Sequence, residues 1–471
     1  MLIAIAALLT VPRFTRAPAP PGFAELILAD DTARVIEAGH PGFLEGLQRA
    51  EHRMPIVSGA QAAHYRQIEI SLESEPDGEH IGVAFRHAGP DTVFSRSLDI
   101  GGQSGPAIAE RITAAASFLS RCVDDILPAM SAPRRDDPRM LLSVYQLCDA
   151  SRTGARTGRL EPYTEEILTL FPDEPGAAAL HALMLVAQPD QHLNGQVDVR
   201  MDANTRRARE LLDFARTDPD TADLVRIGDQ ILTARNADLH TRERLLAEIS
   251  PETWPGINAH LALIALYSLA GRLAEAEYLA SHLTELWPGN PLAHATLALA
   301  QSIRGPDHGA SQTIDAGLQI FPESRVLIMM HDINLSYYGD PERARTDQVS
   351  TPPPHISACI ASFHDARAGL RDGLGDRCDQ MDITQRARML ATLGDVDAAI
   401  DMAERFSPEA VGAGKVLHYP EFFEAWKSPR MWDVARRFGL IDYWRQTGTM
   451  PDICFAQELM AVCEREILAG D

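Results

Sequence analysis

Short runs of alternating apolar and polar residues dominate the first part of the chain. Two of these runs, residues 23–30 and 54–57, predict short strands on either side of a helical stretch, and three more between residues 68 and 98 predict a three-stranded meander. Apolar residues then recur with the period of an amphipathic helix from residue 106 to residue 127. We therefore expect residues 21–128 to form a small α/β domain.

A polar, proline-bounded joint at residues 128–138 separates this part from a longer helical pattern. Beyond the joint, a glycine, an alanine five positions later and a proline recur about every 34 residues, which is the period of the tetratricopeptide (TPR) helix–turn–helix. The glycine is expected to cap the first helix in the left-handed conformation, the alanine to let two helices cross closely, and the proline to stop the second helix. The residues that define the repeat are Gly271, Ala276, Pro288, Gly305, Ala310, Pro322, Gly339, Ala344, Gly394 and Ala399.

The predicted fold class is α+β: a small N-terminal α/β domain followed by an all-α, TPR-like solenoid over residues 138–471. The solenoid ends in a segment rich in aromatic residues that includes Trp432, Tyr443 and Trp444. A terminal repeat has one face that no further repeat covers. We interpret the aromatic segment as a C-terminal cap that covers this face, rather than as a cage for a ligand.

The first helix of each unit lines the concave groove of such a solenoid, where ligands usually bind. Counting from the repeat prolines assigns ten residues to the groove. The groove is apolar and has none of the charged side chains with which peptide-clamping grooves hold a charged ligand. We predict that another part of the chain or a hydrophobic partner fills it. The ten residues are Asn258, Leu261, Ala265, Ser268, Leu269, Leu292, Ala295, Leu299, Ser302 and Ile303.

The N-terminal residues 1–12 are uncharged and almost wholly apolar, and Arg13 and Arg16 lead from them into a proline-rich stretch that ends at residue 20. A membrane span needs about 20 apolar residues, and a secretory signal has a basic segment before its apolar one. We interpret residues 1–20 as the end of a truncated membrane helix or as an atypical signal. The alternative is the buried first strand of a cytoplasmic protein.

The chain has a net charge of −23 and two lysines, Lys415 and Lys427. It has no basic stripe that could contact phosphates, which argues against a nucleic-acid partner for this segment. Gly414 and Lys415 lack the rest of a phosphate-binding loop, and Ser104 lacks the glycine spacing of a nucleophile elbow. We therefore expect no catalytic residue, no metal and no other cofactor.

The six cysteines lie in segments with a helical pattern, and we interpret them as buried thiols. An even number permits disulfides without implying them. Cys359 and Cys378, together with His355 and His364, could in principle supply four zinc ligands. Their spacing does not match a compact zinc-binding motif, so we interpret these residues as structural. The adjacent carboxylates at 124–125 are interpreted as solvated.

The closing segment reads Gly439-Leu440, then Tyr443-Trp444 and Pro451-Asp452-Ile453-Cys454, with a second cysteine at 463. This segment resembles the end of the CadC-like and adenylate-cyclase-associated TPR proteins of bacteria, in which tryptophan commonly stands where this chain has Met450. The strands and helix before residue 128 are similar to the degenerate TolB-amino-terminal-like domain of that family. The resemblance implies a sensor or scaffold module of a membrane-anchored regulator in signal transduction or transcription regulation. The DNA-binding or cyclase domain to which the family joins this module has no counterpart in the sequence.

The same resemblance implies a disulfide between Cys454 and Cys463. Residues 455–462 have a helical pattern, and a straight helix would hold the two Cα atoms about 13.5 Å apart. A disulfide spans at most roughly 7 Å. Either the segment is bent and the bond forms, or it is straight and the thiols are free.

The expected function is that of a non-enzymatic module, extracytoplasmic or membrane-anchored, that binds a protein partner or senses a small-molecule ligand. Membrane contact is expected through residues 1–12. The first alternative is a cytoplasmic TPR scaffold or assembly factor. A more distant alternative is an enzyme with its site in the cleft between the domains.

Overall fold

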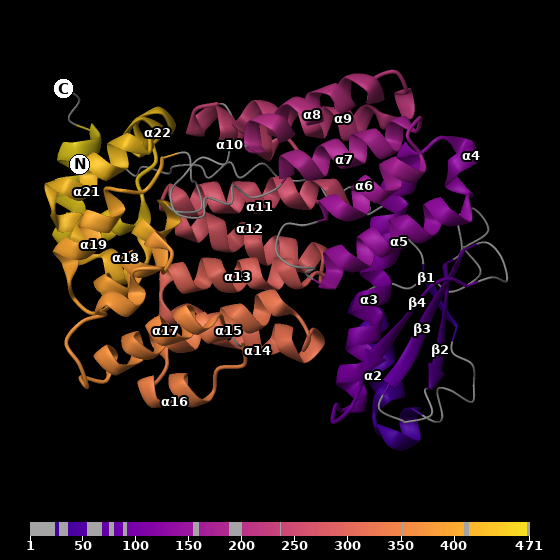
Figure 1. Ribbon diagram of the computed structural model, residues 1–471, viewed down its shortest axis with the longest axis horizontal. Coiled ribbons are helices and arrows are strands. Elements are labelled where there is room, and N and C mark those ends of the chain that lie inside the picture. Colours follow the sequence, from indigo (N-terminus) through magenta and orange to yellow (C-terminus); the bar gives the residue numbers. More distant parts are fainter. Residues whose placement is uncertain are drawn as a thin grey trace, which may run out of the picture.

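The computed structural model of the chain consists mostly of α-helices (Figure 1). It describes residues 24–27, 36–53, 68–74, 80–87, 92–153, 160–187, 200–235, 237–350, 352–408 and 414–468. The described chain beyond residue 138 is helical, which confirms the helical solenoid in the predicted fold class. The apolar N-terminal segment and the predicted strand at residues 54–57 lie outside the described residues.

Four strands form a single sheet beside the helical array (Figure 1). Their order is β1-β2-β3-β4, with β1 and β2 parallel and the later pairs antiparallel. The strands β2 to β4 coincide with the three alternating runs predicted between residues 68 and 98, and α2 (Phe43–Arg53) lies in the chain between the two parallel strands. The strands are β1 (Ala24–Ile27), β2 (Ile68–Ser74), β3 (His80–His87) and β4 (Thr92–Asp99).

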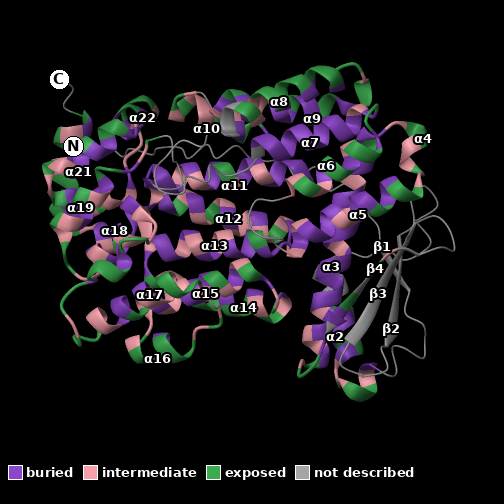
Figure 2. Cartoon of the chain, in the orientation of Figure 1, coloured by how far each residue is buried: buried purple, intermediate pink, exposed green. Residues whose placement is uncertain are grey.

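The helix α3 (Gly105–Ile126) contacts both the sheet-bearing part and the helical array. It packs against β1 and α2, and also against α5, α11 and α14. Proline at position 106 occupies its first turn, where the missing N–H has no intrahelical partner to lose. Because α3 is surrounded by these elements, its side chains are buried along most of its length (Figure 2).

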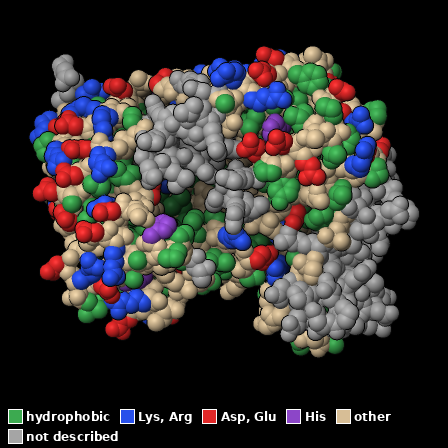
Figure 3. Space-filling model, viewed as in Figure 1, with side chains coloured by type: hydrophobic (Ala, Val, Ile, Leu, Met, Phe, Trp, Pro, Cys, Tyr) green, Lys and Arg blue, Asp and Glu red, His purple; other side chains and the backbone are tan. Residues whose placement is uncertain are grey.

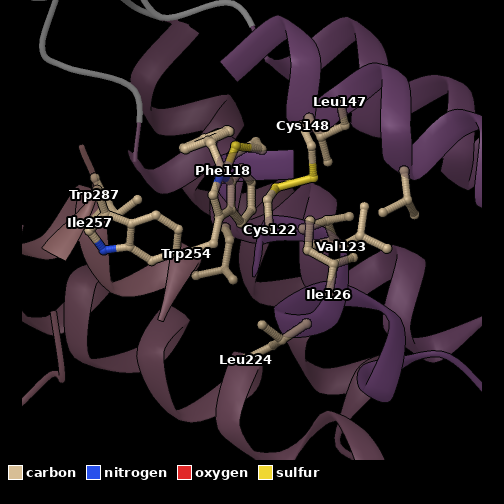
Figure 4. Close-up of a cluster of buried hydrophobic side chains, with 14 of the residues drawn as sticks. Phe118, Cys122, Val123, Ile126, Leu147, Cys148, Leu224, Trp254, Ile257 and Trp287 are labelled. Atoms are coloured by element: carbon tan, nitrogen blue, oxygen red, sulfur yellow. A yellow bond between two sulfur atoms is a disulfide. The ribbon is translucent and has the colours of Figure 1, made fainter. Parts of the chain in front are cut away.

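A disulfide between Cys122 and Cys148 fastens α3 to α5. Close to this disulfide, Phe118, Trp254 and Trp287 lie in one buried cluster (Figure 4). The main hydrophobic core runs from α2 through α3 into the first repeats. It therefore continues across the polar joint that the sequence indicates at residues 128–138.

The remaining helices follow one another in the array, and successive helices pack as neighbouring pairs (Figure 1). A short α4 (Ala132–Arg135) precedes them. Their bounds are α5 (Pro138–Thr153), α6 (Glu161–Leu170), α7 (Pro175–Ala187), α8 (Arg200–Ala215), α9 (Ala222–Arg235), α10 (Leu239–Ala247), α11 (Trp254–Leu269), α12 (Leu273–Leu286), α13 (Pro291–Arg304), α14 (Ala310–Ile320), α15 (Arg325–Tyr338), α16 (Pro341–Thr346), α17 (Pro354–Arg367), α18 (Ile383–Thr392), α19 (Val396–Ala403), α21 (Pro429–Arg437), α22 (Leu440–Thr447) and α23 (Gln457–Cys463).

Most of the residues that define the repeat occupy the structural positions expected of them, but Gly305, with φ of 128° and ψ of 172°, has a positive φ without the αL conformation of the predicted cap. The repeat alanines are at most 1% exposed, which fits a close helix crossing. Gly271 follows α11 with φ of +69°, in the left-handed region that glycine favours. Two repeat prolines follow the ends of α12 and α14. The buried alanines are Ala276, Ala310, Ala344 and Ala399, the prolines are Pro288 and Pro322, and Gly305 and Gly394 also have positive φ.

Gly339 departs further from the prediction, because its φ of −79° is not left-handed. A left-handed cap at this position was the wrong prediction. The carbonyl of Gly339 accepts a hydrogen bond from Arg367 at 3.1 Å, and Asp340 begins the next helix directly. A Cβ atom at position 339 would lie 2.5 Å from a side-chain carbon of Leu335. Glycine is therefore required here by close packing and not by backbone conformation.

Candidate functional site: the face formed by the first helices

The first helices of three successive units, α11, α13 and α15, together form one surface, which we call the A-helix face. Its neighbouring helices are in contact with one another. The structure divides the ten predicted groove residues on this face into two groups. The four residues near the C-terminal ends of α11 and α13 are buried, as is Ala295 nearer the N-terminal end of α13, and the other five are half-buried or exposed. The buried ones are Ser268, Leu269, Ala295, Ser302 and Ile303, and the others are Asn258, Leu261, Ala265, Leu292 and Leu299.

The C-terminal half of this face is covered by residues 414–422 of the same chain, which we call the strap. Ala295 is buried elsewhere, in a core that includes Ala114 of α3. The strap contains two short 3-10 turns, η7 (Lys415–His418) and η8 (Pro420–Phe422), and η7 contacts α11 and α13. Leu417 and Phe422 are fully buried in one core with Leu269 and Ile303. The prediction that the groove is filled is confirmed for this half, and the covering element is a pair of 3-10 turns.

Three polar groups of the C-terminal part of the chain bind the last carbonyls of α11. His418 Nε2 donates to the carbonyl of Leu269 at 2.7 Å, and Trp444 Nε1 donates to that of Ala270 at 2.8 Å. The backbone N–H of Asp452 donates to the carbonyl of Gly271 at 2.7 Å. A helix cannot satisfy its own last carbonyls, so these contacts fix the strap and the cap against the end of α11.

A buried arginine joins the strap to α15 and α18. The guanidinium of Arg388 lies 3.7 Å from the ring centre of Tyr337 and 3.6 Å from that of Tyr419. It also pairs with Glu421 at 3.1 Å and donates to the hydroxyl of Tyr338 at 3.1 Å. The arginine side chain is 2% exposed. Since every contact is inside the fold, we assign this cluster to holding the strap.

The other half of the A-helix face remains accessible. Leu292 is 37% exposed and Met329 is 42% exposed, and half-buried apolar side chains lie between and beside them. In the view of Figure 3, hydrophobic side chains gather near the middle of the molecule. We call this accessible half of the face the open strip, and its members are Asn258, Leu261, Ala265, Leu292, Leu299, Val326 and Met329. None of these side chains is charged.

The aromatic residues of the closing segment are in the core. Trp432, Tyr443 and Trp444 are each 1% exposed, and Trp426, Trp432 and Trp444 contact one another ring to ring. The indole N–H groups of Trp426 and Trp432 donate to the backbone carbonyls of Leu417 and Trp426 at 2.8 and 3.0 Å. With their faces packed and their donors used, these rings form part of a core and leave no cage for a ligand.

All six cysteines are paired in disulfides, so their interpretation as buried thiols is wrong. The helix pairing brings residues 26 and 19 positions apart to Cα separations of 5.9 Å (Cys122–Cys148) and 4.7 Å (Cys359–Cys378). Helical spacing along one segment does not reveal such pairs. His364 bonds to Ser336 at 3.2 Å instead of approaching a cysteine. Among the residues that the structure describes, no group of three or more potential ligands could hold a metal.

The pair Cys454–Cys463 is joined because the segment between them is bent. A 3-10 turn at Asp452–Phe455 precedes α23, which begins only at Gln457. The bend brings the two Cα atoms to 5.8 Å. Of the two arrangements that the sequence leaves open, the structure has the bent one with the bond.

Asp125 is half-buried and makes a contact that the sequence does not reveal. The prediction of a solvated carboxylate is wrong for Asp125, which accepts the backbone N–H of Trp254, the first residue of α11, at 2.6 Å. Burial raises the pKa of Asp125 to about 6, although the N–H of Trp254 and the charge of Arg121 favour the ionised form. Arg121 donates to the carbonyl of Leu286 at 2.7 Å and lies 4.0 Å from the ring centre of Trp287. Asp125 and Arg121 therefore join α3 to the first complete repeat, which contains α11 and α12.

No protein-family model matches the chain, and no curated protein has a significantly similar sequence. Within the described ranges, no helix has both the length and the apolar composition required to cross a bilayer.

Proposed function

We propose that the chain is a non-enzymatic interaction or sensing module that works in an extracytoplasmic compartment. The observation that carries this proposal is the pairing of all six cysteines in three disulfides. Disulfides form and persist in oxidising compartments, whereas cytosolic thiols are kept reduced. The resemblance of the closing segment to CadC-like and cyclase-associated TPR proteins supports the same location. It also supports the assignment of the sheet with α2 and α3 to a small TolB-amino-terminal-like domain.

The open strip is the recognition surface in this proposal. It is accessible and apolar, and it lies on the face where solenoids usually bind their ligands. A protein partner with exposed apolar side chains matches this chemistry better than a charged peptide does. A small apolar ligand would bind to the same strip, and its binding would raise the melting temperature of the chain.

The compartment is tested by trapping the thiols of the chain in living cells. Alkylation before lysis is expected to label none of the six cysteines, and alkylation after denaturation and reduction is expected to label all six. A chain that is labelled before reduction would be cytoplasmic, and the alternative of a cytoplasmic scaffold would then replace the proposal. Fractionation of the same cells provides an independent measurement of location.

The recognition surface is tested by placing a charge on the strip. Met329→Asp is expected to reduce the affinity for an apolar partner peptide at least tenfold and to change the melting temperature little, because the side chain is already 42% exposed. The matched control is Tyr278→Asp, which introduces the same charge on the second helix of a unit, where the side chain is 64% exposed. Equal losses for the two variants would contradict the assignment of the strip.

A further inference from the structure

The two lysines of the chain differ in what surrounds their amines. Lys427 Nζ pairs with the carboxylates of Glu424 at 2.8 Å and Glu458 at 2.5 Å. Lys415 Nζ has no hydrogen-bond partner and no ion-pair partner among the residues that the structure describes. The sequence has 66 Asp and Glu residues for 43 Lys and Arg residues. The lack of a carboxylate beside Lys415 therefore does not come from a shortage of carboxylates in the chain.

The backbone holds Lys415 at a fixed place on the A-helix face. The preceding residue, Gly414, is pressed against two elements, since a Cβ atom there would lie 2.1 Å from a side-chain carbon of Leu269 and 3.0 Å from a ring carbon of Phe438. The following residue, Val416, is buried. Lys415 itself is half-buried and begins η7. Its side chain therefore starts from the edge of an apolar core and remains accessible to a small molecule from solvent.

An amine in these surroundings resists protonation. An ammonium ion loses hydration on burial, and without a carboxylate nothing offsets that loss. Burial lowers the pKa of Lys415 from its ordinary value, whereas the hydrogen bonds to Glu424 and Glu458 raise the pKa of Lys427. At neutral pH a larger fraction of Lys415 is therefore the uncharged amine, which has the lone pair that a nucleophile needs.

We propose that Lys415 is a binding site for small uncharged aldehydes and ketones, which it holds as imines. The lone pair of Nζ attacks the carbonyl carbon, and the carbonyl oxygen leaves as water with the two hydrogens of the amine. A carbon–nitrogen double bond replaces the carbon–oxygen double bond, so the step requires no oxidant or reductant. Desolvated lysines are the ones that form imines with carbonyl substrates in proteins. The apolar neighbours favour an uncharged carbonyl compound, because a buried charge on the ligand would need a partner.

The test compares the two lysines within the full-length chain. Propanal with sodium cyanoborohydride converts each imine to a stable propylamine, and peptide mapping by mass spectrometry measures the initial rate at each lysine. In the folded chain at pH 7, Lys415 is expected to react about tenfold faster than Lys427 or more, since each unit by which a pKa falls multiplies the fraction of neutral amine by about ten. In guanidinium chloride the two lysines are expected to react at similar rates, which is the control for local sequence.

The pH dependence gives a second readout. The ratio of the rate at Lys415 to the rate at Lys427 is expected to fall as the pH rises, because Lys427 loses its proton at the higher pH. The ratio cancels the pH dependence of the reagents, which both lysines share. Lys415→Arg is expected to remove the fast-reacting site, and the matched variant Lys427→Arg is expected to leave it unchanged.

Three results would overturn the proposal. Equal or slower labelling of Lys415 in the folded chain would show that its amine is charged or covered. A ratio of rates that does not change with pH would show that accessibility, and not protonation, separates the two lysines. A fast-reacting site that persists in Lys415→Arg would belong to another amine. Each of these results would leave the thiol-trapping result and the assignment of the open strip unchanged.

Discussion

The two ends of α11 are held by opposite chemistry. At the N-terminal end, the carboxylate of Asp125 accepts the N–H of Trp254 at 2.6 Å. At the C-terminal end, the groups that bind the last carbonyls are donors, among them His418 and Trp444. Both arrangements agree with the helix dipole and with the unpaired backbone groups that every helix end leaves. None of these partners belongs to the repeat that contains α11.

The difference lies in charge and in the amount of packing. The contact at the N-terminal end depends on the half-buried carboxylate of Asp125, and desolvation raises its pKa to about 6. The contacts at the C-terminal end are part of a core of aromatic rings, and burial lowers the pKa of His418 to about 4, so this imidazole is neutral at pH 7. With rising pH, the stability contributed by the N-terminal end of α11 should therefore fall, whereas that contributed by the C-terminal end should rise. The C-terminal end should contribute more stability in total.

The largest expected effect is at the C-terminal end of α11. Trp444→Ala removes a fully buried ring and its hydrogen bond to Ala270, and it is expected to lower the free energy of unfolding by about 3–5 kcal/mol. Urea denaturation followed by circular dichroism measures the loss. Trp444→Phe keeps most of the ring but leaves the carbonyl unpaired, for an expected loss of about 1–3 kcal/mol. A loss below 1 kcal/mol for the alanine variant would contradict a packed cap.

The next effect concerns the disulfide that fastens α3 to the array. Replacing Cys122 and Cys148 together by alanine is expected to cost about 2–4 kcal/mol, mainly because the unfolded chain regains freedom. The matched control replaces Cys454 and Cys463, which are separated by 9 residues instead of 26. The shorter loop predicts a loss smaller by about 1 kcal/mol. A larger loss for the control pair would show that strain or packing, and not loop length, decides the difference.

A smaller effect is expected inside the repeat, between the two held ends. Ala276 is fully buried where α12 crosses its neighbours, so Ala276→Leu should overpack the crossing and cost about 1–3 kcal/mol. Ala274 is exposed on the same helix, and Ala274→Leu is expected to change the stability by less than about 0.5 kcal/mol. Identical urea midpoints for the two variants would place the repeat in the wrong register.

The sequence could predict the repeat because its signals are local. A glycine that ends one helix, an alanine at the crossing and a proline after the next helix each act within a few residues of their position. Gly339 shows the limit, because Leu335 and Arg367 determine its conformation. The backbone conformation of Gly339 therefore follows from its packing contacts and not from its place in the repeat.

The strap and the contact of Asp125 could not be predicted in this way. His418 and its partner Leu269 are 149 positions apart, and two 3-10 turns have no hydrophobic period. Asp125 and Trp254 are 129 positions apart. The neighbouring carboxylates at 124 and 125 look alike in sequence, and only the packing of α3 against α11 places Asp125 at the N-terminus of α11. The sequence thus predicts which helices form the A-helix face. It does not predict how much of that face the strap covers.

The smallest expected effect separates the two ends of α11 by their response to pH. The folded-state pKa of Asp125 is raised from 3.8 to about 6, so the folded chain binds more protons there than the unfolded chain. The stability that this group contributes is present below pH 3.8 and is lost as the pH rises through 6. For His418 the pKa is lowered from 6.5 to about 4, and its contribution rises over the same range. Between pH 4 and 6, the stability contributed by Asp125 falls while that contributed by His418 rises.

Asp125→Asn removes the pH dependence of stability that Asp125 causes and leaves the one that His418 causes. The amide oxygen can still accept the N–H of Trp254, so the contact survives without a charge. The free energy of unfolding is then expected to rise more steeply from pH 4 to pH 6 than in the wild type, and at pH 7 to exceed it by on the order of 1 kcal/mol, since lost attraction to Arg121 offsets part of the gain from removing a half-buried charge. The control is Asp223→Asn, which changes an exposed carboxylate on α9. Parallel stability curves for Asp125→Asn and the wild type would show that this carboxylate is solvated and that the two ends of α11 do not differ in charge.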